Sequence, residues 1–102
     1  MRLFVFFDLP VNTANQRKAY RTFRKFLIKD GYIMLQQSVY SRLLINENAY
    51  DYALSRLRSN RPEEGLVQAL KVTERQFATM QQITGEALIN DEIDSIDEFV
   101  VL

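Results

Sequence analysis

The sequence contains neither cysteine nor histidine. Without cysteine the chain has no disulfides, no thiol nucleophile and no Cys-ligated zinc. Without histidine it lacks the usual general base at neutral pH, Ser-His-Asp triads and His-ligated metals. Glycine occurs only three times, which excludes a glycine-rich loop that cradles phosphates. Any hydrolysis by this chain therefore needs a carboxylate or a metal-activated water.

Long hydrophobic runs are also absent. No stretch approaches the roughly 20 apolar residues of a membrane span, and the first residues carry no signal-peptide pattern. These absences predict a cytoplasmic protein with no membrane partner. Among the 102 residues, 47% are hydrophobic, which predicts one small globular core. A core of this size favours completion against a second copy of the chain.

The formal net charge of zero conceals a separation of charge along the chain. Residues 1–30 carry the acids Asp8 and Asp30 and seven bases, which are Arg2, Arg17, Lys18, Arg21, Arg24, Lys25 and Lys29. Residues 76–102 carry no base and six acids, which are Glu86, Asp91, Glu92, Asp94, Asp97 and Glu98. A basic front and an acidic tail predict a polyanion-binding surface and a separate segment with another role.

The first 45 residues predict three strands. Residues 2–8 form a continuous apolar run that ends in an acid, as in a central strand covered on both faces, and Pro10 stops this strand. Residues 32–45 are rich in β-forming residues and too long for a single strand. We expect two strands here, meeting near Ser41-Arg42.

Two helices are predicted from apolar spacing and end signals. Residues 14–29 place their apolar side chains on one face, with Asn12 or Thr13 available as the cap and Gly31 suited to the end. Asn46 begins the second helix, which ends near residues 60–62.

The remaining segments predict a fourth strand and an appended tail. Residues 66–72 form the fourth strand, a short helical turn capped by Thr73 follows, and residues 81–84 are an expected fifth strand. The order βαββαβ predicts an α+β, ferredoxin-like domain over residues 1–84. Residues 85–102 form an acidic tail ending in a strand whose apolar residues are predicted partner contacts: Phe99, Val100, Val101 and Leu102.

The helix predicted over residues 14–29 is the candidate for binding nucleic acid. Its bases lie on the arc opposite its apolar residues, and the candidate contacts are Arg17, Lys18, Arg21, Arg24 and Lys25. Ordinary solvated faces mix signs to form i,i+4 pairs, yet no acid lies between Arg17 and Lys29. A row of bases can contact successive phosphates without reading base edges. A solvated helix face is the alternative explanation.

Asp8 is the candidate for metal-dependent catalysis. It ends the predicted strand immediately before Leu9-Pro10. An aspartate at such a position often accepts turn hydrogen bonds from backbone N–H groups, and residue type alone favours that role. Mg²⁺ keeps several waters and is held by one or two carboxylates, so a single Asp8 is a poor site. A two-fold dimer that brings two copies of Asp8 together would complete it. Both roles stay open.

Four motifs occur in a characteristic order. They are the strand end Phe6-Phe7-Asp8, the basic helix, Gly31 and the segment Gln37-Ser38-Val39-Tyr40. A second helix and a fourth strand follow. This order resembles the family of small CRISPR-associated adaptation proteins usually called "Cas two", which are endoribonucleases and partners of the CRISPR integrase. The features are most similar to versions from type II loci.

The resemblance implies a ferredoxin-like homodimer whose strand-end aspartates face each other across the two-fold axis. Asp8 would then be the Mg²⁺ ligand and catalytic residue of an endonuclease that cleaves RNA or DNA phosphodiester bonds. The dimer would also sit between integrase dimers and hold duplex DNA for insertion into the CRISPR array, a role that does not require cleavage. Arg17 and Arg21 match basic positions of the family. Single-stranded RNA is a further partner that the resemblance implies. The alternatives are a toxin-type ribonuclease of the same fold and a non-catalytic nucleic-acid-binding module.

Overall fold

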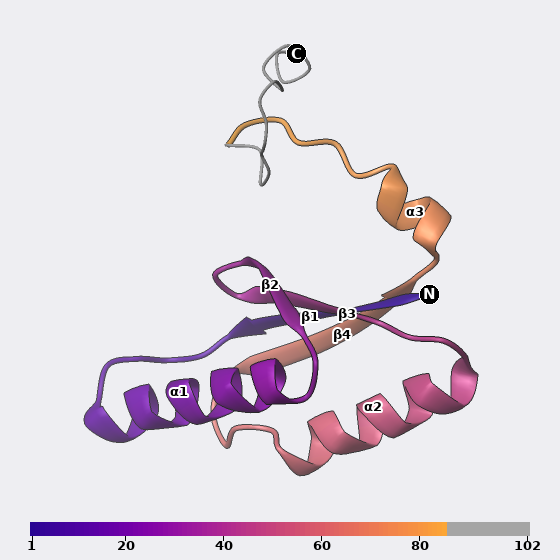
Figure 1. Ribbon diagram of the computed structural model, residues 1–102. Coiled ribbons are helices and arrows are strands. Elements are labelled where there is room, and N and C mark those ends of the chain that lie inside the picture. The colour runs from indigo at the N-terminus through magenta and orange to yellow at the C-terminus, as the bar shows by residue number, and fades with distance from the viewer. Residues whose placement is uncertain (86–102) are drawn as a thin grey trace.

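Four antiparallel strands form one sheet in the order β2-β3-β1-β4 (Figure 1). The computed structural model describes residues 1–85. The strands are β1 (Arg2–Asp8), β2 (Ile33–Gln36), β3 (Val39–Leu43) and β4 (Leu66–Val72). The helices are α1 (Ala14–Lys29), α2 (Glu47–Ser59) and α3 (Glu74–Ala78). The βαββαβ order and the antiparallel sheet confirm the predicted α+β, ferredoxin-like fold.

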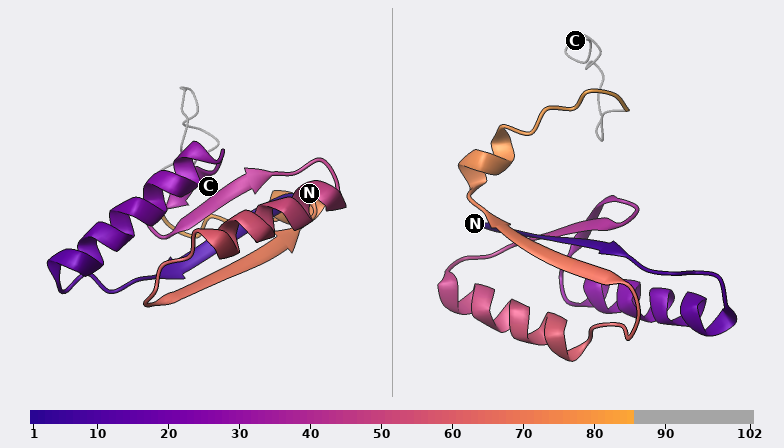
Figure 2. Two further views of the ribbon diagram at one scale, coloured as in Figure 1. Left: turned by 90° about the horizontal axis from the view of Figure 1, so that it is seen from below. Right: turned by 180° about the vertical axis from the view of Figure 1, so that it is seen from behind.

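The two long helices lie side by side against one face of the sheet, and α3 lies on the other side (Figures 1 and 2). We call the sheet face away from α1 and α2 the open face. The core lies between the sheet and the long helices. Leu3, Val5 and Phe7 of the central strand β1 are buried there, and the ring of Phe7 meets Phe23 of α1 edge to face at 5.3 Å between centroids. Removal of this apolar surface from water is the main stabilising contribution to the fold.

Local hydrogen bonds determine where the helices begin. The Thr13 hydroxyl accepts a hydrogen bond from the Gln16 backbone N–H, and the Gln16 side chain accepts one from the Thr13 N–H. This capping box satisfies two donors at the start of α1, so the cap prediction is confirmed at Thr13. Asn46 caps α2 by accepting from the Ala49 N–H at 2.8 Å, and Thr73 caps α3.

A carboxylate at the end of α1 links three elements. Asp30 accepts hydrogen bonds from Arg42 of β3 at 3.2 Å and from Arg56 of α2 at 2.8 Å. The hydrogen bond to Asp30 raises the pKa of the Arg56 guanidinium. Tyr32 lies under Arg42, and burial raises the pKa of its hydroxyl to about 12. Asp30 is therefore a structural acid that holds two arginines.

The predicted junction of the second and third strands near Ser41-Arg42 is wrong. The turn lies at Gln37-Ser38, and β3 runs from Val39 through Leu43. Tyr40 and Ser41 are completely buried, and they pair with residues of β1 in the middle of the sheet. Tyr40 and Ser41 point to opposite faces of the sheet, and both are buried. The chain therefore continues as a hydrogen-bonded strand through position 41 and does not turn there.

The expected fifth strand over residues 81–84 is also absent, because residues 81–85 belong to no strand in the structure. The α3 helix directs this segment over the open face, where Ile83 and Thr84 line a groove with Phe4 and Phe77. A strand needs a neighbour in the hydrogen-bonding plane of a sheet, and this path crosses above that plane.

Three further predictions lie outside the described residues. These are the acidic tail, its C-terminal strand and the contacts of residues 99–102. The boundary between residues 84 and 85 stays a prediction. Within residues 1–85, no helix is long and apolar enough to cross a membrane.

Candidate metal and nucleic-acid sites

Asp8 ends β1 on the open face. Side chains alternate between the two faces of a strand, and Phe7 points to Phe23 in the helix layer. Phe4 and Phe6 stack on each other with centroids 5.9 Å apart, so they occupy the opposite face. Asp8 is in register with Phe4 and Phe6, and it is exposed. The open face therefore combines one carboxylate with apolar side chains.

The α3 helix covers the other end of the open face. The ring of Phe77 packs against Phe4 at 5.7 Å between centroids, and the Arg2 guanidinium lies 4.1 Å from the Phe77 centroid. Arg2 also donates hydrogen bonds to both carboxylate oxygens of Glu74, at 2.8 and 3.1 Å. These hydrogen bonds lower the pKa of Glu74 below its ordinary value. The α3 helix therefore covers one end of the open face, whereas the end that carries Asp8 is not covered by it.

The carboxylate of Asp8 has no hydrogen-bond or ion-pair partner among residues 1–85. The turn role would require backbone N–H donors to this carboxylate, and the described part of the chain supplies none. All lone pairs of Asp8 are consequently available to an external ligand. This arrangement favours the ligand role over the turn role.

Gly65 brings the start of β4 against the backbone of Asp8. The two strands pair to the end of β1, with Asp8 opposite Leu66. Gly65 has a φ of +95°, and a Cβ placed there would lie 2.7 Å from the Asp8 carbonyl oxygen and 2.7 Å from Leu9 Cδ2. Only glycine combines this φ with so close an approach. The chain therefore passes directly beside the backbone of Asp8 as it enters β4.

Gly65→Ala is expected to lower the free energy of unfolding by roughly 1–3 kcal/mol, because alanine is strained at positive φ and its Cβ would collide with Asp8 and Leu9. Gly31→Ala is the matched control, since its φ is +98° but the nearest atom to an added Cβ is 3.7 Å away. We expect Gly31→Ala to cost about 1 kcal/mol. Urea unfolding measures both, and equal losses would show that the approach to Asp8 adds no strain.

At this end of the open face, the described residues of one chain place the carboxylate of Asp8. Among the described residues, no group of three or more Asp, Glu, His or Cys side chains could hold a metal ion. The exposed, unpaired carboxylate of Asp8 suits a hard cation, and Mg²⁺ can be held by two carboxylates plus waters. The donor set therefore fits Mg²⁺ only if a second carboxylate comes from another copy of the chain.

The exposed side of α1 carries the bases predicted to contact nucleic acid. We call it the basic face, and it comprises Arg17, Lys18, Arg21, Arg24, Lys25 and Lys29, all exposed. The Arg17 guanidinium donates to the carbonyls of Val11 and Asn12 at 3.2 and 3.3 Å, which holds it over the start of the helix. The four ion pairs among residues 1–85 use other bases, namely Arg2, Arg42, Arg56 and Lys71. The basic face is therefore available to external anions.

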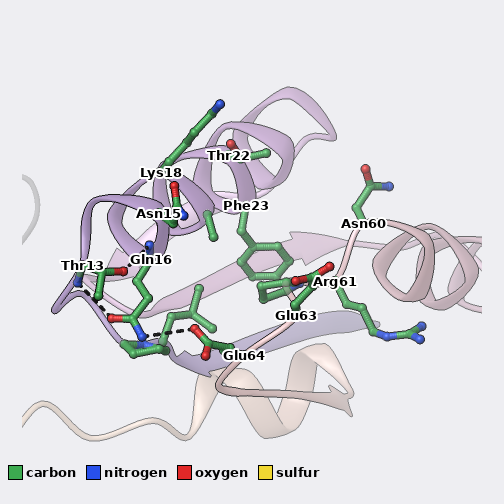
Figure 3. Close-up of a pocket in the computed structure, with 14 residues that line it drawn as sticks. Thr13, Asn15, Gln16, Lys18, Thr22, Phe23, Asn60, Arg61, Glu63 and Glu64 are labelled. Atoms are coloured by element: carbon green, nitrogen blue, oxygen red, sulfur yellow. Dashed lines mark hydrogen bonds between the residues drawn. The ribbon is translucent and has the colours of Figure 1, made fainter.

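A groove of about 880 Å³ lies between the first half of α1 and the segment that precedes β4 (Figure 3). Lys18 and Thr22 line its α1 side, and Asn60, Arg61 and Glu63 line the other side. Arg61 is not among the residues predicted from the sequence to contact nucleic acid. The position of Arg61 follows from the strand pairing. Because β4 runs antiparallel to β1, the loop that precedes β4 must lie near the end of β1. Arg61 lines the side of the groove opposite α1, and its guanidinium points away from α1 and donates to the carbonyl of Arg58 at 3.0 Å (Figure 3).

Residues 1–80 match the protein family described as CRISPR associated protein Cas2. The chain belongs to the Cas2 family. This membership confirms the resemblance drawn from the strand end at Asp8, the basic helix and Gly31.

Similar proteins support the assignment over the full length of the chain. The protein named CRISPR-associated endoribonuclease Cas2 of Treponema denticola is 47% identical over 102 residues, which cover 100% of both chains. The protein of the same name from Streptococcus mutans serotype c is 51% identical over 86 residues, covering 84% of this chain and 79% of that protein. The crystal structure of Streptococcus pyogenes Cas2 at pH 6.5 matches with a TM-score of 0.64 and 18% identity, covering 82% of this chain and 100% of that one. This structural match supports the fold.

Proposed function

We propose that this Cas2 chain is a homodimeric adaptation protein of CRISPR spacer acquisition. In this role it bridges the integrase and holds duplex DNA, and it cleaves RNA or DNA phosphodiester bonds with Mg²⁺ held by two copies of Asp8. One observation carries the proposal: the unpaired Asp8 carboxylate shares the open face with an exposed apolar surface. The name of the relatives, endoribonuclease, supports the cleavage reaction.

The apolar surface of the open face supports dimerisation through this face. Ile33, Leu43, Leu66 and Leu70 are each more than half exposed, and the register puts Leu66 opposite Asp8 and Leu70 opposite Phe4. Exposed apolar side chains gathered on one face of a sheet favour an interaction site. A second copy packed on the same face would bury these side chains and bring another Asp8 to the same interface by two-fold symmetry.

Paired Asp8 residues would supply the carboxylates that one chain lacks. With ligand distances of about 2.1 Å, two carboxylates more than about 8 Å apart are too distant to share one Mg²⁺. The chemistry that bound Mg²⁺ supplies is activation of water and neutralisation of phosphate charge. Asp8 would hold and orient the ion, and the chain has no histidine to act as a general base at neutral pH.

The basic face would hold the nucleic acid. It lies on the helix side of the sheet, so dimerisation through the open face leaves it exposed (Figure 2). Contacts from unpaired arginines and lysines to phosphates give affinity without base specificity. Such binding suits a protein that holds DNA of many sequences for integration. The apolar residues 99–102 are the proposed contacts to the partner subunit or the integrase.

Leu70→Lys tests the dependence of cleavage on the dimer. Leu70 is 53% exposed in the single chain, so lysine should be tolerated by the fold but would bury an unpaired charge in the interface. We expect a monomer in analytical ultracentrifugation and loss of Mg²⁺-dependent cleavage of RNA and duplex DNA, with Asp8 still present. Ile45→Lys, at a position 86% exposed outside the strands, is the control and should remain dimeric and active.

A monomeric Leu70→Lys protein that still cleaves would contradict the shared site. A wild-type dimer that binds duplex DNA but cleaves neither RNA nor DNA would be consistent with the adaptation role and would contradict the proposed nuclease activity. Absence of integrase binding by the wild-type dimer would contradict the bridging role.

A further inference from the structure

Residues 1–85 and the remaining residues have opposite net charges of equal size. Residues 1–85 hold all thirteen bases and seven of the thirteen acids, a net charge of +6. Residues 86–102 hold the other six acids and no base, a net charge of −6. The chain is neutral only because this acidic segment balances the folded domain.

The unbalanced positive charge is concentrated on one surface. Each of the four ion pairs in the described part of the chain neutralises a base outside α1. The basic face carries six bases, and no acid of residues 1–85 forms an ion pair with any of them. A surface with this potential attracts the nearest available polyanion, and the acidic segment is covalently attached to the same domain.

We propose that the acidic segment, residues 86–98, docks on the basic face when nucleic acid is absent and competes with it for that face. The proposal rests on the proposed nucleic-acid role of the basic face and adds its regulation. The acidic segment would act as an internal substitute for phosphates. It raises the concentration of nucleic acid needed for binding and favours long duplexes, which offer more phosphates than the segment has carboxylates.

The spacing of charges is compatible with this docking. Arg17 and Arg24 are seven residues apart on a helix, about 10 Å at a rise of 1.5 Å per residue. Asp91 and Asp94 are three residues apart, about 10 Å in an extended chain. Asp91 and Asp94 can therefore lie opposite Arg17 and Arg24 at the same time. Exposed ion pairs are individually weak, so the docked state is reversible and yields to the denser charge of duplex DNA.

A spin label detects the docking directly. The chain has no cysteine, so Ser95→Cys provides a single site for a nitroxide label. In about 50 mM salt we expect paramagnetic broadening of the α1 amide signals at residues 17–25 of the full chain. The broadening should disappear in about 0.5 M salt, where charges are screened within a few ångströms, and on addition of duplex DNA. No broadening of α1, or broadening unchanged by salt, would overturn the proposal.

Charge-neutral variants measure the competition. Asp91→Asn/Asp94→Asn keeps the apolar residues 99–102 and should bind duplex DNA roughly threefold to tenfold more tightly at low salt, since two weak ion pairs are lost from the competing state. Asp51→Lys has the same change in net charge at an exposed acid of α2 outside the groove and should change affinity by less than about twofold. Equal gains in the two variants would assign the effect to net charge and overturn the proposal. Failure of all three proteins to bind DNA would overturn the proposed function, whereas the spin-label result requires no nucleic acid.

Discussion

Replacing Asp8 with asparagine or alanine is expected to reduce Mg²⁺-dependent cleavage of RNA and duplex DNA by about 100-fold or more, because an ion that contributes several kcal/mol of transition-state stabilisation loses its only carboxylate ligand from each chain. The carboxylate is exposed and makes no contact that stabilises the described domain. The variants should therefore fold and bind DNA as the wild type does. Asp51→Asn, at an exposed acid of α2, is the control.

A second measurement reports the Asp8 pair without relying on activity. Two carboxylates in one interface repel each other when no cation is present. Mg²⁺ should therefore raise the melting temperature of the wild-type dimer by binding the folded state, and Asp8→Asn should lose that increase. In EDTA, Asp8→Asn should be at least as stable as the wild type. Cleavage and Mg²⁺ stabilisation that both survive in Asp8→Asn would contradict the metal assignment.

Arg21→Ala/Arg24→Ala is expected to weaken duplex DNA binding by roughly 50-fold at about 0.1 M salt, since each lost phosphate contact removes about one released counterion. The slope of log K against log salt should become shallower by about two per chain. These positions are preferable to Arg17, whose guanidinium also bonds to the carbonyls of Val11 and Asn12. Fluorescence anisotropy with a labelled duplex at several salt concentrations measures both quantities.

Arg58→Ala/Arg75→Ala separates local contacts from net charge. Both arginines are exposed, one on α2 and one on α3, and their removal changes the net charge by the same amount. We expect the salt slope of this control to stay within about half a unit of the wild-type value. An unchanged slope in Arg21→Ala/Arg24→Ala, or an equal change in the control, would contradict the assignment of the basic face.

The elements predicted correctly are those specified by local signals. The continuous apolar run marks β1 as a central strand of the sheet, and the helices α1 and α2 combine apolar periodicity with caps at Thr13 and Asn46. The turn between β2 and β3 was predicted four residues too late because Gln37-Ser38 contains no glycine, proline or asparagine to mark it. The burial of Tyr40 and Ser41 against β1 determines that turn.

The sequence by itself determined which chemistry is available. The absence of histidine and cysteine, the acid that ends β1 and the separation of charge along the chain are all readable without coordinates. It also identified the family, because the order of short motifs is a property of the chain.

Only the tertiary structure decided how those residues can be used. It puts Asp8 on the open face without a partner, brings Gly65 against it, and leaves the basic face outside every ion pair of residues 1–85. Positions 8 and 65 meet because the register of β1 with β4 aligns Asp8 with Leu66. Register between strands distant in sequence depends on how the whole core packs, and no local pattern of residues encodes it.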